Sequence, residues 1–329
     1  MARNASNAQA ARRVAALLAR FHQQRPIRAG SLLVSIFGDA IAPRGGAVTL
    51  AGLIALAAPF GISERHVRTA VGRLAQEGWF SARRAGRLAE YRLTELGAER
   101  FHEATQRIYG RNPAGWDRQW SLLLLGEHAL RDDARRQLHW LGFGQLQPGV
   151  FIHPNSELTE QRQWLQELRL DDSSLLRSRS EGLDADRRLV ARGWDLQQLA
   201  RGYRRFVNAF APLQSSPAAA LCPREQFIVR TLLIHDYRKI HLQDPLLPPS
   251  LLPHDWIGSA AYELCAALYG QVFPGAEEFL SGTAGTISEP LPPPVPMTYQ
   301  RFGGLAVSRT VPAFAARRSA ESGSPDGHP

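Results

Sequence analysis

The stretch from residue 62 to residue 93 constrains the fold more than any other part of the chain, because it joins an amphipathic helix to a basic hairpin. Ser63 is a favourable helix N-cap, and Glu64 suits the positive end of the helix dipole. At about 100° per residue, the apolar and cationic residues that follow fall on opposite sides of the helix. The expected buried face is Val67, Ala70, Val71 and Leu74, and the expected outer face holds Arg65, Arg68, Thr69, Gly72 and Arg73.

Gly78 ends this helix, and two β-runs at 79–84 and 88–93 flank a turn at Gly86. Three arginines crowd the tip of the predicted hairpin: Arg83, Arg84 and Arg87. Outward arginines on a helix alone are also typical of an ordinary solvated surface. A basic hairpin directly after such a helix favours DNA binding, because this arrangement places a helix in the major groove and a wing on the phosphates or the minor groove.

Further helices are predicted at 31–41, 50–58 and 94–109. Helix, helix, helix and hairpin is the order of a winged helix-turn-helix, and we therefore expect residues 28–110 to form such a DNA-binding domain. We expect residues 1–27 to be a flexible basic arm with one short helix.

The pattern changes after residue 110, and the whole chain is predicted to be an α+β multidomain protein. Strand, helix, strand, helix and strand over 111–182 predict a small α/β sandwich of the ferredoxin-like type. Residues 183–281 are predicted to form a mostly helical C-terminal domain. Residues 282–329 are rich in Pro, Gly, Ser and Ala, and we expect a disordered tail there.

The net charge of +9 is unevenly distributed over the 329 residues. Residues 1–110 hold 16 Arg and Lys against 7 Asp and Glu, whereas residues 111–329 hold 23 of each sign. This division favours a nucleic-acid-binding module attached to a part that does not contact nucleic acid. Only two cysteines occur and no apolar run reaches the roughly 20 residues of a membrane span, so we expect a cytoplasmic protein without a membrane segment.

Four segments carry a family resemblance: SLLVSIFGDAIAPRGG, GISERHVRTAVGRLAQEGW, HWLGFGQLQPGVFIHP and VRTLLIHDYRKIHLQDPLLPPSLLPHDWIG. They resemble the PaaX family of transcriptional repressors, which control genes of phenylacetate catabolism, and the likeness extends from about residue 28 to 280. It implies a winged helix, a central domain similar to Cas2, a helical C-terminal domain and a homodimer on a palindromic double-stranded DNA operator. It also implies release of DNA by an aryl-CoA thioester effector, typically phenylacetyl-CoA, and no resident cofactor.

Two clusters are candidates for the effector site. Arg201, Arg204 and Arg205, with Tyr203 and the aromatic ring of Trp194, would suit an anionic aromatic thioester, although a solvated helix face is the favoured explanation of the arginines.

The second cluster is His235 with Arg238, which would suit the phosphates of CoA. The alternative is a buried hydrogen-bond network in which both side chains bridge to Asp244 or Asp255.

The likeness to Cas2 raises a second class of function, a metal-dependent nuclease. Glu127 follows the first predicted strand of the central domain, but it lacks the paired ligands that phosphodiester hydrolysis needs. We therefore predict a regulator without catalytic residues or a metal site. A DNA-binding protein without an effector is the third hypothesis.

Overall fold

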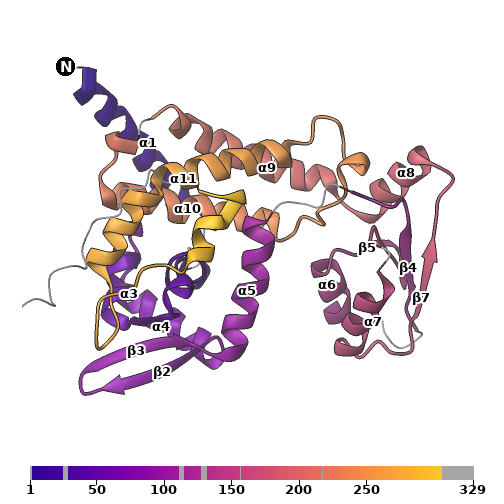
Figure 1. The fold of residues 1–329 in the computed structure, drawn as a ribbon, viewed down its shortest axis with the longest axis horizontal. Coiled ribbons are helices and arrows are strands. Elements are labelled where there is room, and N and C mark those ends of the chain that lie inside the picture. The colour runs from indigo at the N-terminus through magenta and orange to yellow at the C-terminus, as the bar shows by residue number, and fades with distance from the viewer. Residues whose placement is uncertain are drawn as a thin grey trace, which may run out of the picture.

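The computed structural model describes residues 2–24, 29–110, 115–126, 132–155, 157–216 and 218–305. The helical body and the N-terminal domain lie together, and the central domain lies to one side of them (Figure 1). Within the described ranges, no helix has the length and apolar character needed to cross a bilayer.

The N-terminal domain combines helices with a three-stranded antiparallel sheet of order β1-β3-β2. The predicted helix cap at Ser63 is confirmed, and Thr49 and Thr94 cap α3 and α5 in the same way: each of the three side chains accepts a hydrogen bond from a first-turn backbone N–H. The elements in order are α2 (Ala29–Ile36), η1 (Phe37–Ile41), η2 (Ala42–Arg44), β1 (Ala47–Thr49), α3 (Leu50–Ala57), η3 (Ala58–Phe60), α4 (Glu64–Gln76), β2 (Phe80–Ala85), β3 (Leu88–Leu93) and α5 (Glu95–Tyr109).

The first helix of this domain differs from its prediction. It begins at Ala29 rather than at Ser31, and its last turn, Phe37–Ile41, is a π-helix. The sequence also gave no sign of the short strand β1, which pairs antiparallel with β3.

Residues Ala2–Gln23 form one helix, α1, and this differs from the expected mobile arm. Its apolar residues recur every three or four positions and are buried against α9 and α10. The buried stripe is Ala10, Val14, Leu17 and Phe21.

The central domain has a four-stranded antiparallel sheet of order β5-β6-β4-β7. Two helices complete the β-α-β-β-α-β order, so the predicted ferredoxin-like topology is confirmed. One strand, β5, lies where the sequence predicted only a turn. The elements are β4 (Trp120–Leu124), α6 (Asp132–Trp140), β5 (Gly144–Gln147), β6 (Val150–His153), α7 (Leu158–Glu167) and β7 (Ser174–Ser178).

The C-terminal part is helical, and most of it shares one hydrophobic core with the N-terminal domain and α1. Two predicted domains therefore pack as one body. The central domain has one core of its own and a second core that it shares with C-terminal residues 183–196 and 247–252. The C-terminal elements are α8 (Leu183–Gly193), α9 (Leu196–Gln214), η4 (Ala218–Ala220), α10 (Pro223–His241), η5 (Pro249–Leu251), α11 (Ile257–Thr283) and η6 (Pro296–Gly303).

The segment after α11 returns to the N-terminal domain, where disorder was expected. The backbone N–H of Thr49 donates to the carbonyl of Gly285 at 2.9 Å, and that of Val295 donates to the carbonyl of Pro43 at 2.9 Å. Phe302 is buried in the shared core. Residues 306–329 lie outside the described part of the chain.

Candidate nucleic-acid interface and its buried support

Helix α4 separates apolar and cationic residues as predicted. Val67, Ala70, Val71 and Leu74 are its buried residues. The side chains proposed to contact DNA are exposed on the other face: Arg65, Arg68, Thr69 and Arg73.

Two of these arginines pair with carboxylates of the same helix. Arg68 Nη2 lies 2.6 Å from Oε1 of Glu64, and Arg73 Nε lies 3.4 Å from Oε1 of Glu77. All four side chains are at least half exposed, and such surface pairs contribute about 0–1 kcal/mol. A phosphate or a base edge can therefore replace Glu64 and Glu77 as partners of these arginines at a small cost in free energy.

The β2–β3 hairpin projects from the body beside α4 (Figure 1). Ala85 pairs with Leu88, so the turn has two residues, and Gly86 occupies its first position with φ of +58°. A positive φ at this position is a feature of the type II′ turn, which favours glycine. Arg83, Arg84 and Arg87 are all exposed at this end of the hairpin.

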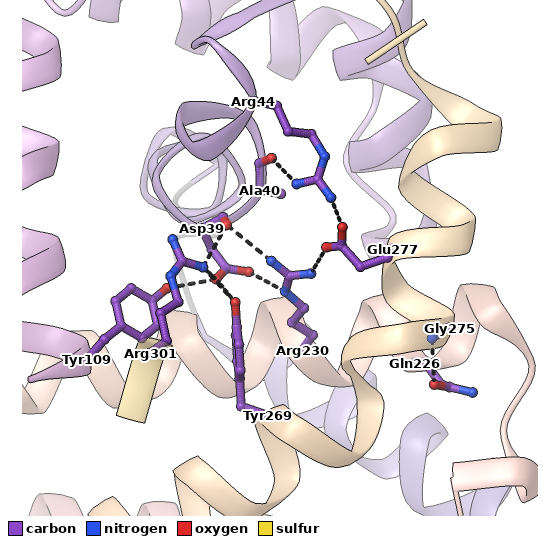
Figure 2. Close-up of polar contacts among 10 residues, drawn as sticks. All are labelled: Asp39, Ala40, Arg44, Tyr109, Gln226, Arg230, Tyr269, Gly275, Glu277 and Arg301. Carbon is purple, nitrogen blue, oxygen red and sulfur yellow. Dashed lines mark hydrogen bonds and ion pairs between the residues drawn. The ribbon is translucent and has the colours of Figure 1, made fainter. Parts of the chain in front are cut away.

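A buried ionic network joins the N-terminal domain to the helical body (Figure 2). The Asp39 carboxylate at η1 accepts from Arg230 Nε of α10 at 2.7 Å and from Arg301 Nη1 of η6 at 2.8 Å. The hydroxyls of Tyr109 and Tyr269 donate to the same carboxylate at 2.7 and 2.8 Å. We call these five residues, together with Arg44 and Glu277, the Asp39 network.

Glu277 of α11 extends the network to a second pair. Its Oε1 lies 2.5 Å from Arg230 Nη1, and its other oxygen accepts from Arg44, whose Nη1 also donates to the carbonyl of Ala40 at 2.7 Å. Asp39 and the three arginines are thus at most 5% exposed, and the Glu277 side chain is 16% exposed.

The pKa values follow from this arrangement. Burial alone raises the pKa of Asp39, but the charges of Arg230 and Arg301 and the hydrogen bond from Tyr109 outweigh it, so the pKa lies below its ordinary value. Burial is also the main reason why the pKa of Tyr269 rises to about 12. The Asp39 carboxylate is therefore charged and both tyrosines are protonated donors at neutral pH.

A second polar contact between α10 and the N-terminal domain involves His235 and Arg238. Nδ1 of His235 lies 2.9 Å from Oγ of Ser35, and Arg238 donates to Oγ of Ser35 and to the carbonyl of Ser31, each at 2.7 Å. The predicted bridges to Asp244 or Asp255 are therefore wrong. Both side chains hold α2, the helix that packs against α4.

The other predicted effector cluster does not come together. Arg201, Arg204 and Arg205 are exposed on α9, whereas Tyr203 points into the core and is 1% exposed. Trp194 packs against Gly144 of the central domain, and its Nε1 donates to the carbonyl of Gly142 at 3.2 Å.

Glu127, the candidate nuclease residue, lies outside the described residues. Among the residues that the structure does describe, no group of three or more His, Cys, Asp or Glu side chains is close enough to bind a metal ion.

The Asp39 network was not predicted from the sequence. One signal was available, since Arg230 is a lone charge within the apolar run FIVRTLLI of α10 and a buried arginine requires a carboxylate partner. Nothing in the sequence identified Asp39 as that partner, because the two residues are 191 positions apart.

Three protein-family models match consecutive parts of the chain. The model of a PaaX-like protein matches residues 28–97, the model of the PaaX protein central Cas2-like domain matches 113–190, and the model of the PaaX-like protein C-terminal domain matches 194–282. The chain belongs to the PaaX family. The resemblance described from the sequence over residues 28–280 is thereby confirmed.

A relative in the PaaX family is the transcriptional repressor PaaX of Escherichia coli strain K12, which is 36% identical over 294 residues, covering 86% of this chain and 93% of the relative. That relative is a regulator and not an enzyme. A solved structure of an uncharacterized protein from Mycobacterium tuberculosis has 24% identity, covers 68% of this chain and 89% of its own, and has a TM-score of 0.43.

Proposed function

We propose that this PaaX-family protein is a transcriptional repressor of phenylacetate catabolism genes and that it binds operator DNA through α4 and the β2–β3 hairpin as a winged helix. The observation that carries the proposal is the set of exposed arginines on these two adjacent elements, in a family whose relative is a transcriptional repressor. The nuclease alternative is not favoured, because that relative is a regulator.

The two elements have different roles in this proposal. Arg65, Arg68, Thr69 and Arg73 face the major groove, where arginine suits the guanine edge. Arg83, Arg84 and Arg87 contact phosphates or the minor groove and add affinity without sequence information.

The test is a gel-shift titration of the protein against its own upstream DNA and against an unrelated duplex. Arg65→Ala is expected to weaken binding by about 1–3 kcal/mol mainly on the upstream site, whereas Arg87→Ala weakens binding to both duplexes and lowers the salt slope by about 1. Arg162→Ala removes an exposed arginine from α7 and serves as the charge-matched control. If Arg65→Ala and Arg87→Ala leave binding at the level of the control, the winged-helix assignment is wrong.

We further propose that the protein acts as a homodimer on a palindromic site and that an aryl-CoA thioester such as phenylacetyl-CoA releases it. Addition of phenylacetyl-CoA to the gel shift tests release, and light scattering of the free protein and of its complex tests the dimer. A monomer on DNA contradicts the dimer. Binding that no aryl thioester in a panel reverses leaves a repressor without an effector.

A further inference from the structure

A cavity of about 700 Å³ lies between α9, the segment that follows α10 and the beginning of α11. Its volume falls within the range of small-molecule sites. Its lining includes Tyr203, His241, Asp244, Leu252, Trp256 and Tyr262, and we call it the Tyr203 cavity.

Much of the wall of this cavity is aromatic and apolar. The rings of Tyr203 and Trp256 meet edge to face with centroids 6.1 Å apart. Leu252 and two prolines of the same connection complete this side of the wall. A flat aromatic ring is the kind of group that such walls bind well.

Three buried polar side chains of the wall, Tyr203, His241 and Asp244, already have hydrogen-bond partners in the protein. Tyr203 Oη donates to Oδ2 of Asp244 at 2.7 Å, and His241 Nε2 lies 3.0 Å from the carbonyl of Arg107. A carbonyl can only accept, so Nε2 of His241 carries the proton, and its Nδ1 accepts from Tyr237, 3.1 Å away. Burial lowers the pKa of His241 to about 4, so the ring is neutral at neutral pH.

Charge at the exposed edge of the cavity restricts the ligand further. Asp255 and Glu263 line it and are exposed, and no cationic Arg or Lys belongs to the lining. Carboxylates there disfavour phosphate or a free carboxylate inside the cavity. The interior therefore suits an uncharged aromatic group.

We infer that the Tyr203 cavity binds the aromatic acyl group of the effector as its uncharged thioester, with the CoA phosphates outside. This inference rests on the proposed function for the identity of the effector and adds where and in which form the acyl group binds. The same aromatic group as a free acid is excluded by its charge, so phenylacetyl-CoA binds and phenylacetate does not.

The cavity wall is also connected to the DNA-binding elements through Arg107 of α5. Arg107 Nη2 donates to the carbonyl of Asp244 at 3.0 Å, and its Nη1 donates to the carbonyl of Trp140 in the central domain at 2.6 Å. At the other end of α5, Thr94 Oγ1 donates to the carbonyl of Gly78 at 2.6 Å, at the junction of α4 and the hairpin. A ligand that displaces Asp244 therefore displaces the helix on which the hairpin is anchored.

The experiment measures ligand binding and DNA release separately. Isothermal titration calorimetry with phenylacetyl-CoA, CoA and phenylacetate is carried out on the full chain, on Leu252→Trp, which fills the cavity, and on Ser250→Trp. Ser250 is exposed on η5, two residues before Leu252, and does not line the cavity, so it is the matched control.

Phenylacetyl-CoA is expected to bind the full chain and Ser250→Trp equally, and to bind Leu252→Trp at least about tenfold more weakly, with unchanged melting temperature and DNA affinity. Equal binding to Leu252→Trp, or phenylacetate binding as well as the thioester, overturns the inference. If the protein binds the thioester in the cavity but does not bind DNA, the proposed function fails and the cavity site stands. If it binds DNA but no thioester, the cavity site fails and the DNA-binding assignment stands.

Arg107→Lys tests the connection, because it keeps the charge but cannot bridge two carbonyls. We expect phenylacetyl-CoA to bind this variant within about twofold of the parent, while release of DNA requires at least about tenfold more thioester. An unchanged release curve overturns the connection through Arg107.

Discussion

The Asp39 network gives the most demanding test of this structure. Asp39→Asn keeps the shape of the side chain but removes one of the two carboxylates, so Arg44, Arg230 and Arg301 are left with Glu277 alone. In either orientation of the new side-chain amide, its NH₂ group takes the place of an Asp39 carboxylate oxygen that accepts hydrogen bonds in the parent protein. Uncompensated buried charge of this kind costs about 3–5 kcal/mol, and we expect the free energy of unfolding to fall by that amount.

The assay is urea unfolding followed by far-ultraviolet circular dichroism, with the slope of free energy against urea compared between variants. Glu64→Gln is the control, because it breaks an exposed pair with Arg68 and is expected to cost less than about 1 kcal/mol.

The pH dependence adds a check on the mechanism. Because the pKa of folded Asp39 is lowered, its carboxylate stabilises the protein above the unfolded pKa, and this contribution is lost as the pH falls through the folded pKa. The difference between parent and Asp39→Asn is therefore expected to be constant from about pH 5 to 8. A cost below about 1 kcal/mol, or one that disappears within this range, would refute the argument for a charged, paired Asp39.

Two further predictions concern the fold. A Cβ on Gly97 would lie 2.3 Å from the carbonyl oxygen of Trp79, so Gly97→Ala should destabilise the protein by about 1–3 kcal/mol. A Cβ on Gly72 meets nothing within 4 Å, so Gly72→Ala should stabilise α4 by about 0.5–1 kcal/mol. Thermal melting measures both effects. Burial lowers the pKa values of His153 and His241 to about 4, so the unfolded chain binds these protons more tightly. The contribution of these two histidines to the free energy of unfolding is therefore complete above about pH 6.5 and is lost as the pH falls to about 4, at roughly 3 kcal/mol for each histidine. A melting temperature that does not change over this pH range contradicts their burial as neutral rings.

The sequence predicted those parts of the fold that depend on local patterns. The faces of α4 follow from the spacing of Val67, Ala70, Val71 and Leu74, and the caps and the turn at Gly86 follow from single residue types. The spacing of strands and helices likewise indicated the ferredoxin-like type of the central domain, although it missed strand β5. These features are determined within about 30 residues of chain, where periodicity and turn chemistry act.

The parts that the sequence did not predict depend on distant partners. Helix α1 has an apolar stripe, but its arginines favoured the prediction of a solvated arm. The structure shows that α9 and α10 pack against this stripe. The segment after α11 has few large apolar residues, and it is held by backbone hydrogen bonds to the N-terminal domain, by burial of Phe302 and by the ion pair of Arg301 with a carboxylate 262 positions earlier in the chain. The number of large apolar residues in a segment indicates how much free energy their burial can contribute. It gives no information on ion pairs with distant residues.

The same long-range contacts change what the charge count means for DNA binding. The excess of nine positive charges over residues 1–110 includes Arg44, which is 2% exposed and paired with Glu277, and Arg107, which bridges two carbonyls. Neither is available to phosphate. The exposed arginines proposed to contact DNA are Arg65, Arg68, Arg73, Arg83, Arg84 and Arg87. Arg92 of β3 is also exposed, but it pairs with the buried carboxylate of Glu90.

These six arginines limit the salt dependence of DNA binding. If each neutralises one phosphate, log K falls with log salt with a slope of about −5 per protomer, whereas the full excess of nine charges would give about −8. Fluorescence anisotropy over a range of salt concentrations distinguishes the two values. A slope near −8 would mean that basic residues outside α4 and the hairpin also reach the DNA. A slope near −5 that falls by about 1 in Arg87→Ala, and not in the control Arg162→Ala, would confine the contact to these two elements.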